Sequence, residues 1–406
     1  MIFPVIPAKA GIQTADGYKI VWTPAFAGVT WRDRHLPLYL TDDQAMLRDT
    51  AREFMAAEGS IAKQYRKYRD MNCKDGFGHA LWKQFGEMGF TGILIDEADG
   101  GLGLGHVEAG IVLEEIGRNL TPSPFLVTAV AVVEALRGTR HGERWYPGIL
   151  AGETVAALAV DEGSKHRPEA IAMTAERSGN GFRLSGRKQF VVQGASADVF
   201  VVAADTTDGL TLFSVEKGTK GLEIEGVRLA DASIGARLEF DRVEVDADAV
   251  IGEVGRGRDV LRRVLNAGRA GAASELVGVG SQAMAMTVDY LKQRKQFGRL
   301  IGEFQALQHR AAHLYSELEI ARAATLKAQQ LLSEDAEEAD MMVSVAKAKS
   351  GQASALAVQE GVQMHGGIGM TDEYDIGLYM KRDRVLNELF GDASYHADKV
   401  ARLNGY

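Results

Sequence analysis

Hydrophobic positions change their period twice along the chain, and these changes predict three folded regions. In the first region apolar residues recur three or four positions apart, after a Thr-x-x-Gln pattern at Thr41 and Gln44 that is typical of a capping box. Residues 81–104 predict a short helix, an extended piece and a glycine-rich loop, and two further helices follow over 107–116 and 128–136. We therefore expect an N-terminal helical domain over residues 38–151.

The second region, residues 152–257, alternates apolar and polar positions in short segments separated by Gly, Asp and Asn. Its predicted strands are 154–160, 170–176, 181–186, 188–194, 198–204, 210–216 and 238–245. This pattern predicts an antiparallel, barrel-like β domain.

From residue 258 the hydrophobic period lengthens again and predicts long helices over 259–290, 304–332 and 340–364, with a fourth helix starting near Asp375. Spacing close to that of a coiled coil favours a four-helix bundle over residues 258–406, with surfaces left for neighbouring subunits. The predicted fold class is α+β, with the β domain between two helical domains.

Residues 1–37 follow none of these periods. Short apolar segments alternate there with Gly and Pro. A secretory signal would have a positively charged region before an apolar core, and this segment has none. We interpret this segment as a non-native or disordered leader. The alternative is a short arm that docks on the first domain.

Composition narrows the class of protein. A chain of 406 residues with 46% hydrophobic residues can bury a large core and should contain two or three domains. Its net charge of -9 disfavours binding to nucleic acid or to anionic lipid, and the apolar run from Pro124 to Leu136 is too short to cross a bilayer. The single cysteine, Cys73, indicates a reducing compartment, so we expect a cytoplasmic protein.

Two stretches of the C-terminal region carry candidate binding chemistry. In Arg294–Gln305 (RKQFGRLIGEFQ), a break at Phe297 leaves Arg294 and Gln305 on either side of a turn. In Gln363–Glu373 (QMHGGIGMTDE), a helix ends in paired glycines that allow an anionic ligand to approach backbone N–H groups. Arginine forks and exposed amides suit a pyrophosphate. Each stretch alone is also compatible with a plain helix C-cap beside a charge.

Together the two stretches resemble the flavin-binding signatures of the acyl-CoA dehydrogenase family, and the resemblance extends over about residues 40–406. It implies oxidation of an acyl-CoA to a 2-enoyl-CoA in fatty acid β-oxidation, with electrons passed to an electron-transfer flavoprotein. It also implies a tetramer, with no metal, membrane or nucleic acid involved. The implied FAD contacts, largely across a subunit boundary, are Arg294, Phe297, Gln305, Gln363, Met364, His365, Gly366 and Gly367.

The part of the family pattern that surrounds the flavin ring is altered. The family's Trp-Ile-Thr-Asn-Gly strand reads Phe190-Val191-Val192-Gln193-Gly194 here, so that Val192 replaces a hydroxyl donor. The loop with Thr-Glu-Pro and Gly-Ser-Asp is rebuilt as Asp161 to His166. Phe190, Val192, Val160 and Asp161 remain candidate ring contacts, with an ordinary strand end as the alternative for Val160 and Asp161.

The family's catalytic base is also missing from its usual places. The glutamate that follows an aromatic residue falls on Gly391, and its other known position falls on Gly268, before Arg269, to which the resemblance assigns substrate binding. Asp392 is the remaining candidate base, although one step along a helix turns a side chain by about 100°. Its alternative role is to cap the last helix.

The stretch LFGDASYH resembles the small subunits of pimeloyl-CoA dehydrogenase-like enzymes. The resemblance therefore leads us to expect a heteromer with a second acyl-CoA dehydrogenase subunit, and little activity of this chain alone. A base-less subunit that contributes half of an FAD site to a heteromer, an acyl-CoA oxidase and a nucleic-acid-binding relative remain alternatives. The choice between a homo- and a hetero-tetramer and the acyl chain of the substrate stay open.

Overall fold

The structure is a computed structural model that describes residues 38–406, so the expected leader over 1–37 lies outside the described residues. The capping box is confirmed, because Thr41 Oγ1 accepts from the Gln44 amide at 3.2 Å and Gln44 Oε1 accepts from the Thr41 amide at 3.0 Å. The first helices are α1 (Asp42–Ala57), α2 (Lys67–Asp70), α3 (His79–Glu87), α4 (His106–Asn119), α5 (Val133–Leu136) and α6 (Arg140–Leu150). Shorter helical turns are η1 (Ala62–Arg66), η2 (Phe90–Gly92), η3 (Glu97–Asp99) and η4 (Leu126–Val132).

Two sequence expectations for this region are wrong. The piece predicted as extended within 81–104 forms the 3₁₀ turns η2 and η3 instead. Helix α6 was not predicted at all, since it contains Pro147 and a run of polar residues.

The middle region forms one open sheet. Its strands are β1 (Ala156–Ala159), β2 (Thr174–Ser178), β3 (Gly181–Val192), β4 (Val199–Thr206), β5 (Gly209–Glu216), β6 (Leu222–Arg228), β7 (Ile234–Val245) and β8 (Val250–Ile251). They lie in the order β6-β7-β3-β2-β4-β5-β8, and β1 pairs in parallel with β4. The expectation of a barrel-like domain is therefore corrected, because the two ends of this sheet do not pair.

Strand β3 joins the two strands predicted over 181–186 and 188–194. Its pairing with β7 shifts register between Leu184 and Gly186 and again between Lys188 and Val191. Such irregularities bend a strand and redirect its side chains. Strand β6 was not predicted, although Leu222 to Glu225 alternate apolar and polar residues; it is an edge strand without a fully buried residue.

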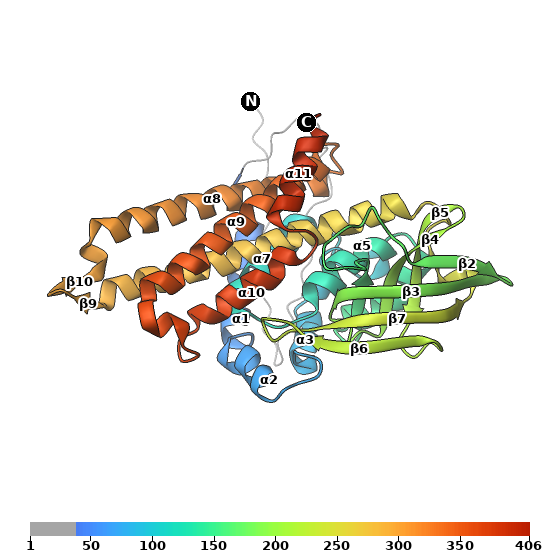
Figure 1. Cartoon of the computed structure of the whole chain (residues 1–406), viewed down its shortest axis with the longest axis horizontal. Coiled ribbons are helices and arrows are strands. Elements are labelled where there is room, and N and C mark those ends of the chain that lie inside the picture. The colour runs from blue at the N-terminus through green and yellow to red at the C-terminus, as the bar shows by residue number, and fades with distance from the viewer. Residues whose placement is uncertain (1–37) are drawn as a thin grey trace, which may run out of the picture. The chain divides into compact units, whose positions relative to one another are not determined.

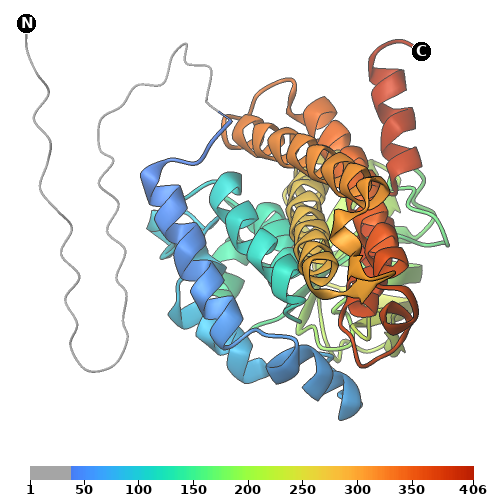
Figure 2. The ribbon, with the colours of Figure 1, turned by 90° about the vertical axis from the view of Figure 1, so that its left-hand side faces the viewer.

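The C-terminal bundle consists of α7 (Gly257–Gln293), α8 (Gln305–Ser333), α9 (Ala339–His365) and α10 (Ile376–Glu388), followed by α11 (Ala393–Leu403). The minor elements there are η6 (Ile301–Glu303), η7 (Gly366–Met370) and the hairpin of β9 (Lys295–Gln296) and β10 (Arg299–Leu300), whereas η5 (Ala247–Ala249) lies between β7 and β8. Figure 1 shows the bundle to one side of the sheet, with α7 extending between them, and Figure 2 shows α1 and α4 beside the bundle. The four-helix bundle is thus confirmed.

Helix α7 contacts α4, α8, α9, α10 and strand β5, so it joins all three regions. A Cβ atom on Gly278 would lie 2.0 Å from the Glu114 carbonyl oxygen, and therefore only glycine allows α4 to pack so closely on α7. A buried ion cluster adds a second link, since Arg382 of α10 pairs with Glu275 of α7 at 2.6 Å and with Asp231 before β7 at 2.7 Å. These contacts fix the bundle against the sheet, which is where the site lies.

Residues 38–406 contain no helix that has both the length and the apolarity required to span a bilayer.

Candidate active site

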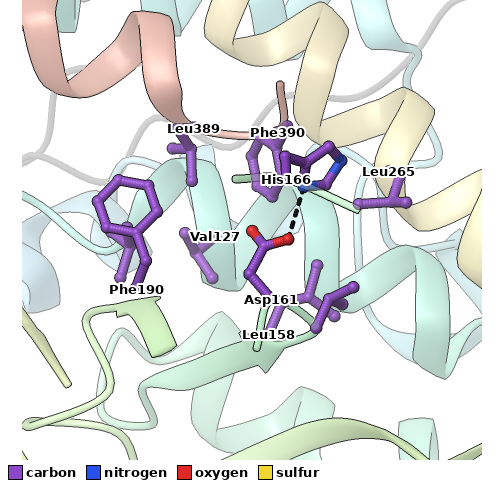
Figure 3. A pocket seen from close by; sticks show the side chains of 10 residues that line it. Val127, Leu158, Asp161, His166, Phe190, Leu265, Leu389 and Phe390 are labelled. Carbon is purple, nitrogen blue, oxygen red and sulfur yellow. Dashed lines mark hydrogen bonds and ion pairs between the residues drawn. The ribbon is translucent and has the colours of Figure 1, made fainter. Parts of the chain in front are cut away.

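A small cavity of about 20 Å³ lies where the end of β1, the end of β3, helix α7 and the α10–α11 turn meet. Figure 3 shows the side chains around it. Two of its lining residues, Asp161 and His166, are ionisable, and the others are apolar: Val127, Leu158, Val160, Phe190, Val192, Leu265, Leu389 and Phe390. We call this space the inner cavity. It combines an apolar wall with a single polar pair.

The polar pair is joined by a hydrogen bond of 2.8 Å between His166 Nδ1 and Asp161 Oδ1. The His166 side chain is 4% exposed and that of Asp161 is 13% exposed. On the other side of the ring, His166 Nε2 lies 3.2 Å from Arg269 Nη2. A guanidinium only donates hydrogen bonds, so Nε2 accepts, and the proton of a neutral ring is on Nδ1, which donates to Asp161.

Arg269 is fully buried in the middle of α7, and burial lowers its pKa. Besides His166 it donates to Phe390 O at 3.2 Å, to the Tyr395 hydroxyl at 3.2 Å and to Asn266 Oδ1 at 3.4 Å. Each of these acceptors is neutral. Its charge is balanced by the carboxylates of Asp340 and, beyond His166, of Asp161.

The α10–α11 turn closes the inner cavity. Phe390 and Gly391 have φ angles of 61° and 104°, and Lys347 Nζ holds the turn by donating to Asn387 O at 3.2 Å and Gly391 O at 3.0 Å. Burial, aided by the charge of Arg269, lowers the pKa of Lys347 to about 7. A buried cation is thus committed to two backbone carbonyls of this turn.

Neither family position for the glutamate has room for a side chain. A Cβ atom at Gly268 would lie 2.8 Å from Phe390 Cε2, and one at Gly391 would lie 2.5 Å from Tyr395 Cδ1. The ring of Phe390 therefore occupies the space beside Gly268. The glycines at both positions are a consequence of how this turn packs.

Asp392, the candidate base, caps α11 instead. Its Oδ1 accepts from the Tyr395 amide at 2.8 Å, which lowers the pKa of the carboxyl, and its Oδ2 lies 3.4 Å from Lys165 Nζ. Asp392 lines neither the inner cavity nor the larger one described next. Of its two proposed roles, the structure supports the cap and not the base.

A second cavity of about 390 Å³, which we call the outer cavity, shares Asp161, His166 and Phe190 with the inner one. Its remaining lining residues are Gly163, Ser164, Lys165, Gln189, Val227, Leu229, Gly235, Ala236, Arg237, Arg384 and Glu388. Three cations among them suit a phosphorylated ligand. Phe190, with φ of 52°, stands at the boundary between the two cavities.

Models of three acyl-CoA dehydrogenase domains match the chain: the N-terminal domain over residues 41–153, the middle domain over 158–243 and the C-terminal domain over 255–403. Isovaleryl-CoA dehydrogenase of Solanum tuberosum is 30% identical over 87% of this chain and 88% of that protein. The chain belongs to the acyl-CoA dehydrogenase family. The members it matches are oxidoreductases that act on CH–CH bonds and depend on FAD.

Other acyl-CoA dehydrogenases show how far the likeness extends. The short/branched chain specific acyl-CoA dehydrogenase of Bos taurus is 28% identical over 89% of this chain and 85% of that protein. The Tcur3481–Tcur3483 steroid ACAD structure has a TM-score of 0.82 at 29% identity and covers 89% of this chain and 98% of that one. The acyl-CoA dehydrogenase of Geobacillus kaustophilus has a TM-score of 0.82 at 25% identity, over 91% and 99% of the two chains.

The flavin signatures of the family lie apart from both cavities. Arg294 ends α7 and is exposed, Phe297 at the tip of the β9–β10 hairpin is 90% exposed, and Gln305 begins α8. At the end of α9, Gln363 is exposed, and Cβ atoms on Gly366 and Gly367 would meet nothing within 4 Å. The Gly366 amide donates to the Val362 and Gln363 carbonyl oxygens, while the space beside both glycines is open, so a ligand can approach the backbone there.

Three other predicted contacts are more buried. Met364 and His365 are buried, and His365 Nδ1 lies 2.7 Å from the Gly361 carbonyl oxygen with its ring 4.5 Å from that of Tyr290. Val192 lines the inner cavity with an aliphatic side chain, so it offers the flavin ring no donor. The sequence around the expected flavin ring thus departs from the family pattern, while the signature residues expected at the phosphates keep their identity.

Sequence analysis missed His166, Lys347 and Tyr395 as site residues. His166 lies in the rebuilt loop, which was itself the available signal, yet nothing in the sequence pairs it with Arg269, 103 positions away. Lys347 sits at a buried position of a long helix, where its spacing reads as ordinary amphipathicity.

Proposed function

We propose that this acyl-CoA dehydrogenase oxidises an acyl-CoA thioester to a 2-enoyl-CoA and passes the electrons to an electron-transfer flavoprotein. The observation that carries the proposal is the Asp161–His166 pair in an apolar cavity next to a larger, cation-lined one. A thioester needs an apolar place for its acyl chain, a base for its α-proton and cationic groups for its phosphates. The inner cavity places an apolar wall beside the Asp161–His166 pair, and the outer cavity offers three cations.

The residues present fit FAD in its phosphate half. Arg294, Gln305, Gln363, Gly366 and Gly367 would hold the phosphates from a neighbouring subunit, since they are exposed in the single chain. When bound, FAD supplies the hydride acceptor that no side chain provides. We therefore propose a tetramer in which each flavin lies between two chains.

In the same chain, Phe190, Val192, Val160 and Asp161 would face the flavin ring from the end of β1 and β3. Their part is to position the ring and to exclude water from the reacting carbons. We place Arg269 behind the cavity as a charge that acts through His166, because it lines neither cavity itself.

A second candidate is a non-catalytic subunit of a heteromer that contributes half of a flavin site to its partner. It is favoured by the closed packing at Gly268 and Gly391, which leaves no place for the family's glutamate. It also fits the name of the Tcur3481–Tcur3483 steroid ACAD, which pairs two proteins. In either case we propose a cytoplasmic location.

One experiment separates these candidates. The purified chain is reconstituted with FAD and mixed anaerobically with straight-chain and branched acyl-CoAs, and the loss of flavin absorbance is followed. Rapid bleaching by the chain alone supports the dehydrogenase, whereas bleaching that requires a co-expressed second subunit supports the heteromer. Peroxide formed in air at the rate of bleaching would indicate an oxidase instead.

A further inference from the structure

We propose that Asp161 is the proton acceptor of this chain and replaces the glutamate that is absent from Gly391 and Gly268. The inference rests on the proposed acyl-CoA oxidation, and it assigns the base to a loop of the β domain instead of to the helical bundle. It also decides between the two candidates above, because a chain with its own base does not need a partner for the chemical step.

The carboxylate of Asp161 lies where the inner and outer cavities meet. Oδ1 of Asp161 is committed to His166 at 2.8 Å, and Figure 3 shows the other oxygen turned away from His166, toward the middle of the lining residues. Asp161 also lines the outer cavity, so its carboxylate stands at the passage between the two. No other carboxylate lines the inner cavity, and Glu388 in the outer cavity pairs with Arg384 at 2.9 Å.

The backbone of Asp161 is held rigidly, as a base requires. Its carbonyl oxygen accepts from the Gln189 amide of β3 at 2.7 Å. Lys188, the residue before Gln189, is fully buried and donates on both sides of Asp161, to the Val160 carbonyl oxygen at 3.1 Å and to Glu162 Oε1 at 2.7 Å. Three consecutive loop residues are therefore fixed to one strand, which keeps the carboxylate in place.

His166 is a positioning residue in this arrangement. Because Arg269 donates to Nε2, the ring presents Nδ1–H to Asp161 and fixes the carboxylate plane. The buried guanidinium at the far end of the relay holds the orientation of the imidazole ring through its donation to Nε2. The order carboxylate, imidazole, guanidinium thus leaves one carboxylate oxygen unengaged by His166.

Asp161 takes one proton from the α-carbon of the substrate. The α C–H bond of the thioester breaks, the proton passes to the free oxygen of Asp161, and the electron pair stays on the substrate as an enolate delocalised onto the thioester carbonyl. FAD, when bound, would accept the hydride released as the β C–H bond breaks, and the α,β double bond would form. Two electrons leave the substrate, and one proton remains on Asp161.

The test measures proton abstraction without oxidation. With the flavin chemically reduced beforehand, the reconstituted chain is incubated in D₂O with each acyl-CoA of the panel, and deuterium at the α-carbon is measured by mass spectrometry. Wild type should exchange the α-proton, and Asp161→Asn should lose at least about 100-fold of the exchange rate, the lower range for a general base. Asp398→Asn, an exposed partner of Arg402 on α11, is the matched control.

Rescue of the Asp161→Ala variant by an added carboxylate tests the same role, because a misfolded variant would not be rescued. Formate, a small carboxylate, should restore part of its exchange, while chloride at the same ionic strength should not. His166→Asn should lower the exchange rate at saturating acyl-CoA, because the carboxylate of Asp161 loses its orienting donor. Full exchange in Asp161→Asn, or loss of exchange in Asp392→Asn, overturns the proposal, as does the absence of exchange in wild type.

Failure of this inference differs from failure of the proposed function. If acyl-CoA bleaches the flavin equally fast in wild type and in Asp161→Asn, the function stands and the base lies elsewhere. If exchange depends on Asp161 while no acyl-CoA bleaches the oxidised flavin, the base is right and the oxidation is wrong.

Discussion

Replacing Gly391 by alanine tests whether the α10–α11 turn excludes the family's glutamate. The backbone there has φ of 104°, a conformation that L side chains rarely adopt, and the new Cβ would lie 2.5 Å from Tyr395 Cδ1 and 3.0 Å from His396 Nε2. The strained backbone costs about 1 to 3 kcal/mol. Crowding of the buried ring costs about as much again, roughly 1 to 3 kcal/mol.

Alanine also lowers the conformational entropy of the unfolded chain, which raises the unfolding free energy by about 0.4 to 1 kcal/mol. The net loss of unfolding free energy for Gly391→Ala is therefore about 1 to 5.5 kcal/mol. With an unfolding entropy of about 2 cal/mol/K per residue, a chain of this size loses roughly 1.2 °C of Tm for each kcal/mol, so Tm should fall by about 1 to 7 °C.

The assay is calorimetric or fluorescence-detected melting of the flavin-free chain, with Gly163→Ala as the matched control. Gly163 has no atom within 4 Å of a built Cβ and no positive φ, so its variant should melt within about 1 °C of wild type. A Gly391→Ala variant that melts like wild type would refute the reasoning. So would Gly391→Glu if it folded normally and exchanged the α-proton faster than wild type.

Three further predictions use other parts of the chain. Arg294→Ala and Arg294→Lys should each weaken FAD binding about tenfold or more in flavin titrations. One charge-assisted contact contributes about 1.5 to 3 kcal/mol, and lysine lacks the guanidinium fork. Unchanged flavin retention would show that the turn is only structural. Asp392→Ala should lower the unfolding free energy by about 1 kcal/mol through loss of the α11 cap, whereas Asp392→Asn, an equally good cap, should not. Denaturant midpoints measure both variants, and a lower midpoint for Asp392→Asn than for Asp392→Ala would contradict the cap. Burial, together with the charges of Arg269 and Lys347, lowers the pKa of His396 from 6.5 to about 2, so the unfolded chain binds one more proton than the folded chain between these values. Stability should therefore fall as pH drops below 6.5, by about 1.4 kcal/mol per unit from this group, and His396→Gln should flatten the curve of Tm against pH; an identical acid limb in the variant would contradict this.

The sequence by itself determined the order of the three regions, the capped start of α1, the long bundle helices and the resemblance to the flavin signatures. These features are local. A Thr-x-x-Gln pattern identifies a helix start within four residues. The long helices α7, α8 and α9 repeat their apolar spacing many times, so single exceptions do not hide the helical period. The signatures at Arg294 and Gln363 likewise lie in contiguous stretches, so their residues can be read together without knowing the fold.

Only the tertiary structure decided which ionisable groups meet. Asp161 and His166 are five positions apart, but the guanidinium that orients them comes from α7 and the apolar wall from β3 and the α10–α11 turn. Asp392 seemed the sole carboxylate near the site because sequence distance from Gly391 was the available measure. The fold turns Asp392 into a helix cap and brings Asp161 to the cavity, since burial and direction of a side chain depend on how distant elements pack.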